Sequence, residues 1–237
     1  MCGDDLLRSD RDGCRAAHAR LLATLAGLGP GDARRSSRLH GWTVGHVLSH
    51  LARNADSHVR MLSAAQRGEV ADQYAGGRAQ RAADIEVGAG RPEADLVADV
   101  VAGCRRLEAA WTQTADQVWQ AGRGRVASGE WPLRDLPFRR WREVEVHHAD
   151  LGLGFGWQDW SDAYVARELE RTVAVLAPRL PAGRSLRLAA TDTGAAWTVP
   201  EGGGDPVEAS APGRELLAWL TGREGGPGLP PLTGWER

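Results

Sequence analysis

Histidines and carboxylates recur at helical spacing in two stretches of this 237-residue chain, and REVEVHHADLG at residues 142–152 holds the closest pairs. On a helix, Glu143 and His147 would lie about 40° apart in azimuth on successive turns. Glu145 and His148, three positions apart, would form a second pair rotated from the first. Converging lone pairs of this kind are what a divalent metal needs, and zinc binds such nitrogen and oxygen ligands at about 2.0 to 2.2 Å. One helix would therefore supply two ligands.

A third ligand must come from elsewhere, and GWTVGHVLSHLARNADSHVRML at residues 41–62 offers candidates. His46, His50, Asn54 and His58 recur every fourth residue, so they follow one side of a helix. His46 lies in the first turn and can serve the helix end, His50 lies one turn deeper beside leucines, and His58 is expected to be solvated. A Glu–His pair four residues apart is usually only a weakly stabilising surface pair. Spacing alone therefore leaves a surface role open beside a metal site.

The pairing of Glu143 with His147 requires a helix, although the alternation over residues 143–147 also fits a strand. Three features favour the helix. The segment extends back through LPFRRW, Pro137 suits a first turn, and Gly152 stands where a helix should end. We therefore predict a helix that ends near Gly152.

Three other segments have apolar residues at a period of 3.6, and with the helix just described they predict four helices. The segment between the second and third helices is rich in glycine and is expected to be a loop with at most short helical pieces. Four helices joined by short and medium loops favour an antiparallel bundle. The three helical segments and the loop are residues 4–29, 43–68, 92–122 and 68–92.

The pattern changes after GLGFGW, at residues 152–157. The expected elements are a helix, two strands on either side of a turn, a third strand and a last helix, at residues 161–178, 185–199, 206–211 and 213–223. The expected fold class is thus α+β, with a helical bundle over residues 1–153 and a small α+β domain over residues 154–237.

Composition narrows the class of protein. The formal net charge of -2, without a basic block, argues against nucleic acid as a partner. Every basic residue besides histidine is an arginine. The three cysteines, Cys2, Cys14 and Cys104, are widely spaced and favour neither a disulfide framework nor a cysteine zinc site. With no long apolar run and no signal-peptide pattern, we expect a cytoplasmic protein without a membrane partner, monomeric or weakly homo-oligomeric.

The two histidine-containing stretches, together with the tail GRELLAWLTGR, resemble the mycothiol-dependent maleylpyruvate isomerases, a branch of the DinB-like metal-binding bundles. The resemblance covers most of the chain. It implies a DinB-like four-helix bundle followed by a sterol-carrier-like domain. It also implies a divalent metal, normally zinc, held by His50 of the HLA step and by Glu143 and His147 of the ExxxH step. Helical geometry had singled out the same pair.

The activity implied by this resemblance is the cis–trans isomerisation of maleylpyruvate to fumarylpyruvate, with the low-molecular-weight thiol mycothiol as cofactor. A thiolate would add to the conjugated double bond, rotation about the new single bond would follow, and the thiol would leave unchanged. A free thiol has a pKa of about 8.5 and is mostly protonated at neutral pH, whereas a metal-bound thiol is deprotonated.

The substrate would be a dicarboxylate-like anion, so arginines are expected near it. The resemblance implies an essential arginine from the second domain, with Arg223 as first candidate and Arg214 as second. Arg223 would equally suit the negative end of its helix dipole. Arg53, Arg139 and Arg140 are further candidate clamps that could equally be solvated.

Three functions remain open at this point. The first is maleylpyruvate isomerase. The second is a mycothiol S-transferase that conjugates the thiol to another electrophile and releases the adduct. The third is a non-catalytic metal-binding bundle, which is the weakest because the second domain matches an enzyme pattern.

Overall fold

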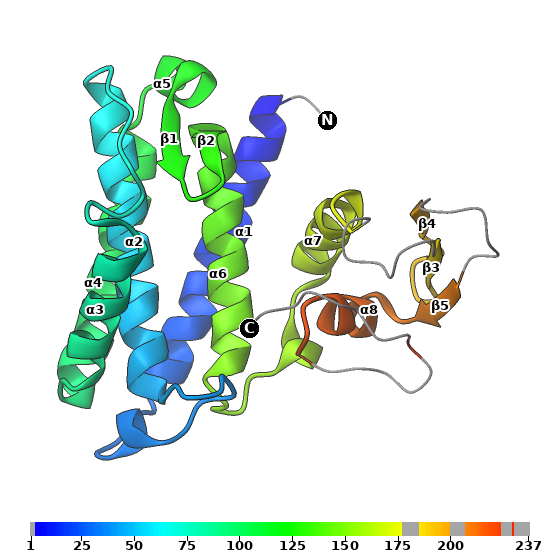
Figure 1. The fold of residues 1–237 in the computed structure, drawn as a ribbon, viewed down its shortest axis with the longest axis horizontal. Coiled ribbons are helices and arrows are strands. Elements are labelled where there is room, and N and C mark those ends of the chain that lie inside the picture. The colour runs from blue at the N-terminus through cyan, green and yellow to red at the C-terminus, as the bar shows by residue number, and fades with distance from the viewer. Residues whose placement is uncertain (1–2, 177–184, 200–206, 224–228, 230–237) are drawn as a thin grey trace. The chain divides into compact units, whose positions relative to one another are not determined.

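The computed structural model describes residues 3–176, 185–199, 207–223 and 229 (Figure 1). The chain divides into two compact units, Met1–Phe155 and Gly156–Arg237, and each is described by itself. The expected α+β fold class with an N-terminal helical bundle is confirmed.

Four long helices build the bundle of the first unit (Figure 1). Contacts between residues of rising number, such as Arg53 with Asp99 and Gln66 with Thr114, show that the second and third of these run parallel. The first and fourth also run parallel, because Arg20 contacts Glu145 and Thr24 contacts His148. The two pairs are antiparallel to each other, because His50 contacts Glu143 whereas Asn54 contacts Arg140. The four helices are α1 (Gly3–Leu25), α2 (Val44–Gln66), α4 (Glu93–Gln113) and α6 (Leu136–Asp150).

The segment at residues 68–92 differs from the expected loop, because it contains α3 (Gly77–Ala89), which runs back along α2. This helix lacks an apolar stripe, with only Ile85 and Ala89 buried along it. Gly88 is needed for close packing rather than for a break in the helix, since a Cβ there would overlap the Ser49 side chain. α3 takes the chain back to the start of the bundle, which is why α2 and α4 are parallel.

The prediction of one helix over residues 92–122 is also wrong in part. α4 ends at Gln113, and a short helix and a hairpin that the sequence pattern did not predict follow it. Gly124 in the hairpin packs directly against the side chain of Met61 on α2. These elements and the 3₁₀ turns of the unit are α5 (Asp116–Ala121), β1 (Arg123–Val126), β2 (Gly129–Pro132), η1 (Asp32–Arg34) and η2 (Leu133–Asp135).

The segment that ends in REVEVHHADLG is helical, as predicted, so the strand alternative is excluded. Pro137 lies in its first turn, and Gly152 adopts a φ of 68°, which ends the helix in the left-handed region. Trp141 packs against α1 so closely that a Cβ on Gly13 would overlap its ring.

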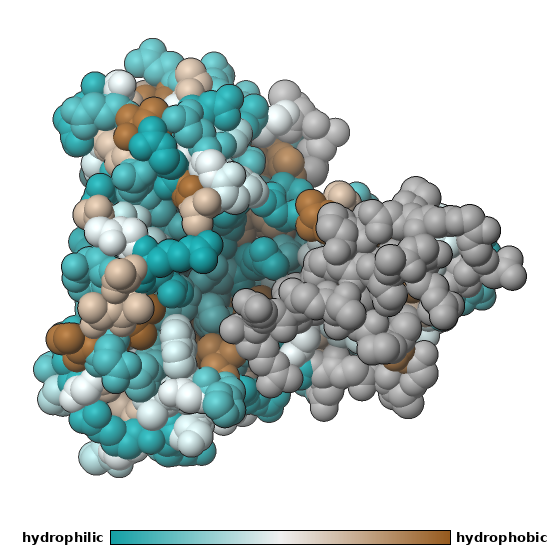
Figure 2. Space-filling view, in the orientation of Figure 1, coloured by the Kyte–Doolittle hydropathy of each residue, from teal (hydrophilic) through white to brown (hydrophobic). Residues whose placement is uncertain are grey.

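The apolar stripes of the bundle helices are buried, as in Leu21, Leu48, Leu107 and Val144. On the face shown in Figure 2 the bundle is mostly hydrophilic, with only scattered hydrophobic patches. Among the described residues, no helix has the length and apolar character to cross a membrane.

The second unit holds a three-stranded sheet in the order β4-β3-β5 and two helices that pack on each other. β3 pairs antiparallel with β4 and parallel with β5. Both predicted helices and all three predicted strands are present, although residues 177–184 of the predicted first helix and its following loop lie outside the described residues. The elements are η3 (Trp157–Asp159), α7 (Asp162–Ala174), β3 (Leu186–Ala190), β4 (Ala196–Val199), β5 (Val207–Ala211) and α8 (Gly213–Leu220).

Candidate metal centre

The three residues singled out from the sequence lie together in the first unit. His50 projects from α2, and Glu143 and His147 project from α6. One potential ligand atom from each lies within 4.8 Å of the others. His50 Nε2 is 2.8 Å and His147 Nε2 is 3.6 Å from Glu143 Oε2, and the two imidazole rings are nearly perpendicular, with centroids 4.7 Å apart. Two nitrogens thus converge on one carboxylate.

The centre is closed on one side and open on the other. The side chain of His50 is 3% exposed, whereas those of His147 and Glu143 are 16% and 33% exposed. The ring of Trp42 contacts His50 edge-on, at a centroid distance of 5.9 Å. A small molecule can therefore approach the cluster from the side of Glu143, while the α2 side is sealed.

The start of α2 fixes the position of His50. Thr43 is the N-cap, and its side chain accepts a hydrogen bond from the backbone N–H of His46. The His46 ring in turn accepts one from the Thr43 backbone N–H, completing a capping box. The predicted role of His46 at the helix end is confirmed, and His50 follows one turn later.

A buried carboxylate orients His147. Asp150 Oδ2 lies 2.9 Å from His147 Nδ1, and Asp150 is only 2% exposed. A histidine that donates its Nδ1–H to a carboxylate presents an unprotonated Nε2, which is the usual arrangement for a metal ligand. Asp150 therefore directs His147 Nε2 toward Glu143.

His50 has a different partner on its other nitrogen. Arg81 Nη2, from α3, lies 3.0 Å from His50 Nδ1. Arginine only donates, so Nδ1 accepts and Nε2 carries the proton that is donated to Glu143. Arg81 was not predicted, because its segment has no helical apolar stripe and was expected to be a loop.

The electrostatics of the cluster suit a divalent cation. Burial lowers the pKa of His50 to about 4, so this ring is neutral at physiological pH. Burial alone would raise the pKa of Glu143, but the imidazoles of His147 and His50 outweigh it and hold the pKa well below its usual range. Burial would lower the pKa of His147, yet the nearby carboxylates of Asp150 and Glu143 raise it. Two imidazoles and one carboxylate are a donor set that fits zinc.

The other residues of the two histidine stretches are engaged elsewhere. His148 Nε2 lies 2.8 Å from Thr24 Oγ1, and its ring stacks on Phe155. Glu145 pairs with Arg20 on α1. The rotated pair of Glu145 and His148 thus faces away from His50. His58 was expected to be solvated and is instead 1% exposed, because its face of α2 points into the bundle.

The arginines of the first unit that were considered as clamps already have partners. Arg53 pairs with Asp99 at 2.7 Å. Arg140 is fully buried and donates hydrogen bonds to its neighbours. The guanidinium of Arg139 lies 3.1 Å above the ring of Trp131. Their part in substrate binding is therefore not favoured.

The two arginines expected in the second unit lie at either end of α8. Arg214 donates to the carbonyl of Trp160 and pairs with Asp162, each at 2.7 Å. Arg223 is half-buried and donates to the carbonyl of Thr221. A role for either arginine at the metal centre stays a prediction.

Comparison with known proteins agrees with the resemblance. The family model for the mycothiol maleylpyruvate isomerase N-terminal domain matches residues 14–152, more than half of the chain. Among solved structures, the chain is similar to a mycothiol-dependent maleylpyruvate isomerase, with a TM-score of 0.87, 21% identity and 99% of each chain covered. A histidine-to-alanine mutant with that name gives a TM-score of 0.86 at the same identity and coverage.

These structures establish the fold over the whole length, while their low identity leaves the substrate to be argued separately. No curated protein matches the chain. The family match over residues 14–152 covers both stretches that carry the metal centre. The chain therefore belongs to the mycothiol maleylpyruvate isomerase family.

Proposed function

We propose that this protein is a thiol-dependent isomerase that converts maleylpyruvate to fumarylpyruvate, with mycothiol as the thiol and a divalent metal, preferentially zinc, at the centre. The observation that supports the proposal is the convergence of His50, Glu143 and His147 from two helices. Three protein ligands leave a coordination position free, which distinguishes catalytic from structural zinc sites. The name and fold of the similar solved structures agree with this activity.

The residues of the chain have separate tasks in this proposal. His50, Glu143 and His147 hold the ion, and Asp150 keeps the His147 ring in the ligating tautomer. Zinc held there would lower the pKa of a bound thiol or polarise a substrate oxygen. Arg223, with Arg214 as second candidate, is proposed to bind a substrate carboxylate.

The overall reaction separates this proposal from a transferase. Addition of a thiolate turns the conjugated double bond into a single bond, and rotation and loss of the thiolate restore the double bond in the trans geometry. The thiol is regenerated, so it is needed but not consumed. A mycothiol S-transferase would instead consume one thiol for each product molecule.

The test is an absorbance time course of maleylpyruvate with zinc-loaded protein, with and without mycothiol, followed by chromatography of the product. We expect fumarylpyruvate to form only with the thiol, at constant thiol concentration. Loss of thiol into a stable adduct would replace the isomerase by the transferase. No reaction in either sample would contradict the proposed substrate.

A further inference from the structure

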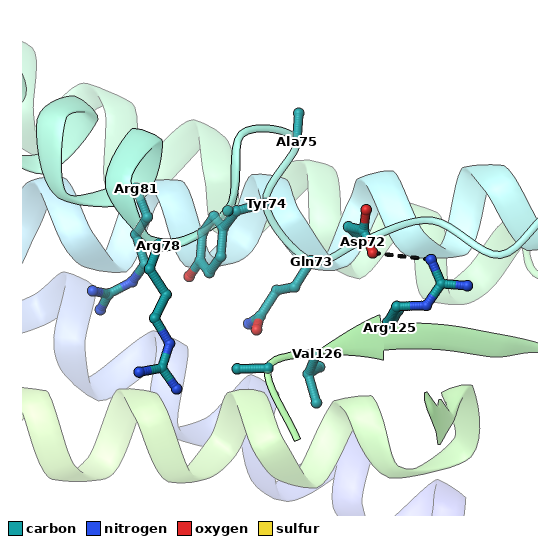
Figure 3. A pocket seen from close by; sticks show the side chains of 10 residues that line it. Asp72, Gln73, Tyr74, Ala75, Arg78, Arg81, Arg125 and Val126 are labelled. Atoms are coloured by element: carbon teal, nitrogen blue, oxygen red, sulfur yellow. Dashed lines mark hydrogen bonds and ion pairs between the residues drawn. The ribbon is translucent and has the colours of Figure 1, made fainter. Parts of the chain in front are cut away.

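A pocket of about 660 Å³ lies in the first unit, where the loop before α3 meets the β1 strand (Figure 3). It is lined by the segment Asp72–Tyr74, by Arg78 and Arg81 of α3, and by Arg125 of β1. Figure 3 shows Arg78 and Arg81 extending on the same side from the start of α3, with Arg125 at the opposite end of the pocket. The pocket thus has a cationic end and an ion-paired end.

The arginines at the two ends of the pocket differ in whether carboxylates pair with them. Arg125 pairs with Asp72 at 3.2 Å and with Glu130 at 3.3 Å, so two carboxylates surround it. Within the part of the chain that the structure describes, neither Arg78 nor Arg81 has a carboxylate within ion-pair distance. Two guanidinium groups therefore face one pocket with their charge uncompensated. Arginine is the side chain best suited to bind carboxylates through paired N–H groups.

Arg81 connects this pocket to the metal centre. Its guanidinium lies over the ring of Tyr74, 5.7 Å from the centroid, and Nη2 is 3.0 Å from His50 Nδ1. A small molecule whose carboxylate is bound by Arg81 would consequently lie one side chain away from His50, Glu143 and His147. That separation suits a small molecule with a reacting centre a few bonds from its acid group.

The chemistry of His50 limits the contact with Arg81. A histidine that ligates through Nε2 carries its proton on Nδ1 and usually donates it to an acceptor. Arg81 offers another donor at that position, so two N–H groups would face each other once His50 ligates through Nε2. Arg81 would then gain by turning to an anion in the pocket. Metal binding and anion binding should therefore favour each other.

We propose that Arg78 and Arg81 form the carboxylate-binding subsite for the substrate of this metal centre, with a preference for dicarboxylates. The proposal rests on the proposed function for the position of the reacting group, whereas the anion affinity of the pocket does not depend on any thiol. Two uncompensated cations favour a ligand with two carboxylates over one with a single carboxylate.

Calorimetric titration of zinc-loaded protein with maleate tests this subsite, and crotonate serves as the monocarboxylate. We expect Arg78→Gln and Arg81→Gln each to raise the Kd for maleate at least about tenfold, as expected for losing a charge-assisted contact of ordinary strength. The matched control is Arg105→Gln, because Arg105 is exposed on α4 and outside the pocket. Its Kd should stay within about twofold of that of the unchanged protein.

Two further measurements make the result decisive. Zinc content separates loss of the subsite from loss of the metal, and Arg78→Gln, which does not involve the residue that contacts His50, should keep full zinc. Arg81→Lys should recover part of the maleate affinity, because it restores the charge without the paired N–H groups.

Unchanged maleate binding in both pocket variants, or no maleate binding by the unchanged protein, would overturn the proposal. Failure of the subsite can be told apart from failure of the proposed function. Arginine-dependent maleate binding without thiol-dependent isomerisation would contradict the function alone. Isomerisation with unaffected Arg78→Gln and Arg81→Gln variants would contradict the subsite alone.

Discussion

Two polar clusters lie in the same helical bundle, and a comparison of them explains why only one fits a metal ion. The metal centre joins two histidines to one partly exposed carboxylate. The second, which we call the arginine cluster, lies between α1, α2, α4 and α6 and is buried except for its carboxylate. It contains the residues Cys14, His18, Cys104, Glu108 and Arg140.

The arginine cluster has the residue types of a metal site but is already neutralised. His18 Nδ1 is 2.7 Å from Glu108, and His18 Nε2 accepts from Arg140 Nε at 3.2 Å. The guanidinium thus holds the ring nitrogen that would otherwise ligate. Arg140 also donates to the Leu51 carbonyl and to Asn54 Oδ1, which links α6 to α2. Residue types alone do not make a metal centre. The ring nitrogens that would bind the metal must also be free of a hydrogen bond from an arginine of the protein, and His18 Nε2 is not.

Of the two clusters, the arginine cluster is where we expect a substitution to have the largest effect on stability. Arg140→Ala should lower the free energy of unfolding by about 3–5 kcal/mol, since it leaves buried acceptors of three helices unpaired. Urea denaturation measures the loss. The exposed control Arg105→Ala should change it by less than about 0.5 kcal/mol, and equal stability of both variants would remove the structural role of Arg140.

At the metal centre we expect substitutions to change zinc affinity. His50→Ala, Glu143→Ala and His147→Ala should each weaken zinc binding by more than about a hundredfold, because each removes a direct ligand. Competition with a fluorescent chelator measures the affinity. His148→Ala, whose ring contacts Thr24 instead, should keep its zinc. Equal zinc affinity in all four variants would remove the metal centre.

A smaller effect is expected for the residue that orients a ligand. Asp150→Asn should weaken zinc binding by about 10- to 100-fold, because the amide no longer holds the His147 tautomer as a carboxylate does. The same chelator assay applies. A zinc affinity equal to that of the unchanged protein would show that Asp150 does not orient His147 for metal binding.

His58 gives an effect that is absent at neutral pH and appears only in acid, as a pH dependence of stability. Burial lowers its pKa to about 3, below the value of about 6.5 in an unfolded chain, so the unfolded state takes up the proton first as pH falls. Its contribution is complete above pH 6.5 and is lost toward pH 3, with a slope approaching about 1.4 kcal/mol per pH unit.

Urea denaturation at several pH values measures this slope. His58→Gln should lose stability less steeply between pH 6 and pH 4.5 than the unchanged protein, since glutamine takes up no proton. Parallel curves would show that His58 is not held neutral by burial.

The sequence pattern predicted the helices with strong apolar stripes and the pair of Glu143 and His147, because side chains at i and i+4 meet on any straight helix. The choice of His50 as the third residue came from the family resemblance. The pattern did not predict α3, since its burial depends on close packing of Gly88 on Ser49 rather than on an apolar face. Arg81 was missed for the same reason. The burial of His58 depends on which face of α2 meets the bundle, and a row of polar residues does not reveal that.

The measurement that tests the account most directly is the zinc K-edge X-ray absorption spectrum of the zinc-loaded protein. A zinc ion at His50, Glu143 and His147 predicts a first shell of nitrogen and oxygen at about 2.0–2.2 Å, with the multiple scattering of two imidazoles and no sulfur. A sulfur shell at about 2.3 Å would contradict the account, because it would place the metal at a cysteine of the chain and not at His50, Glu143 and His147.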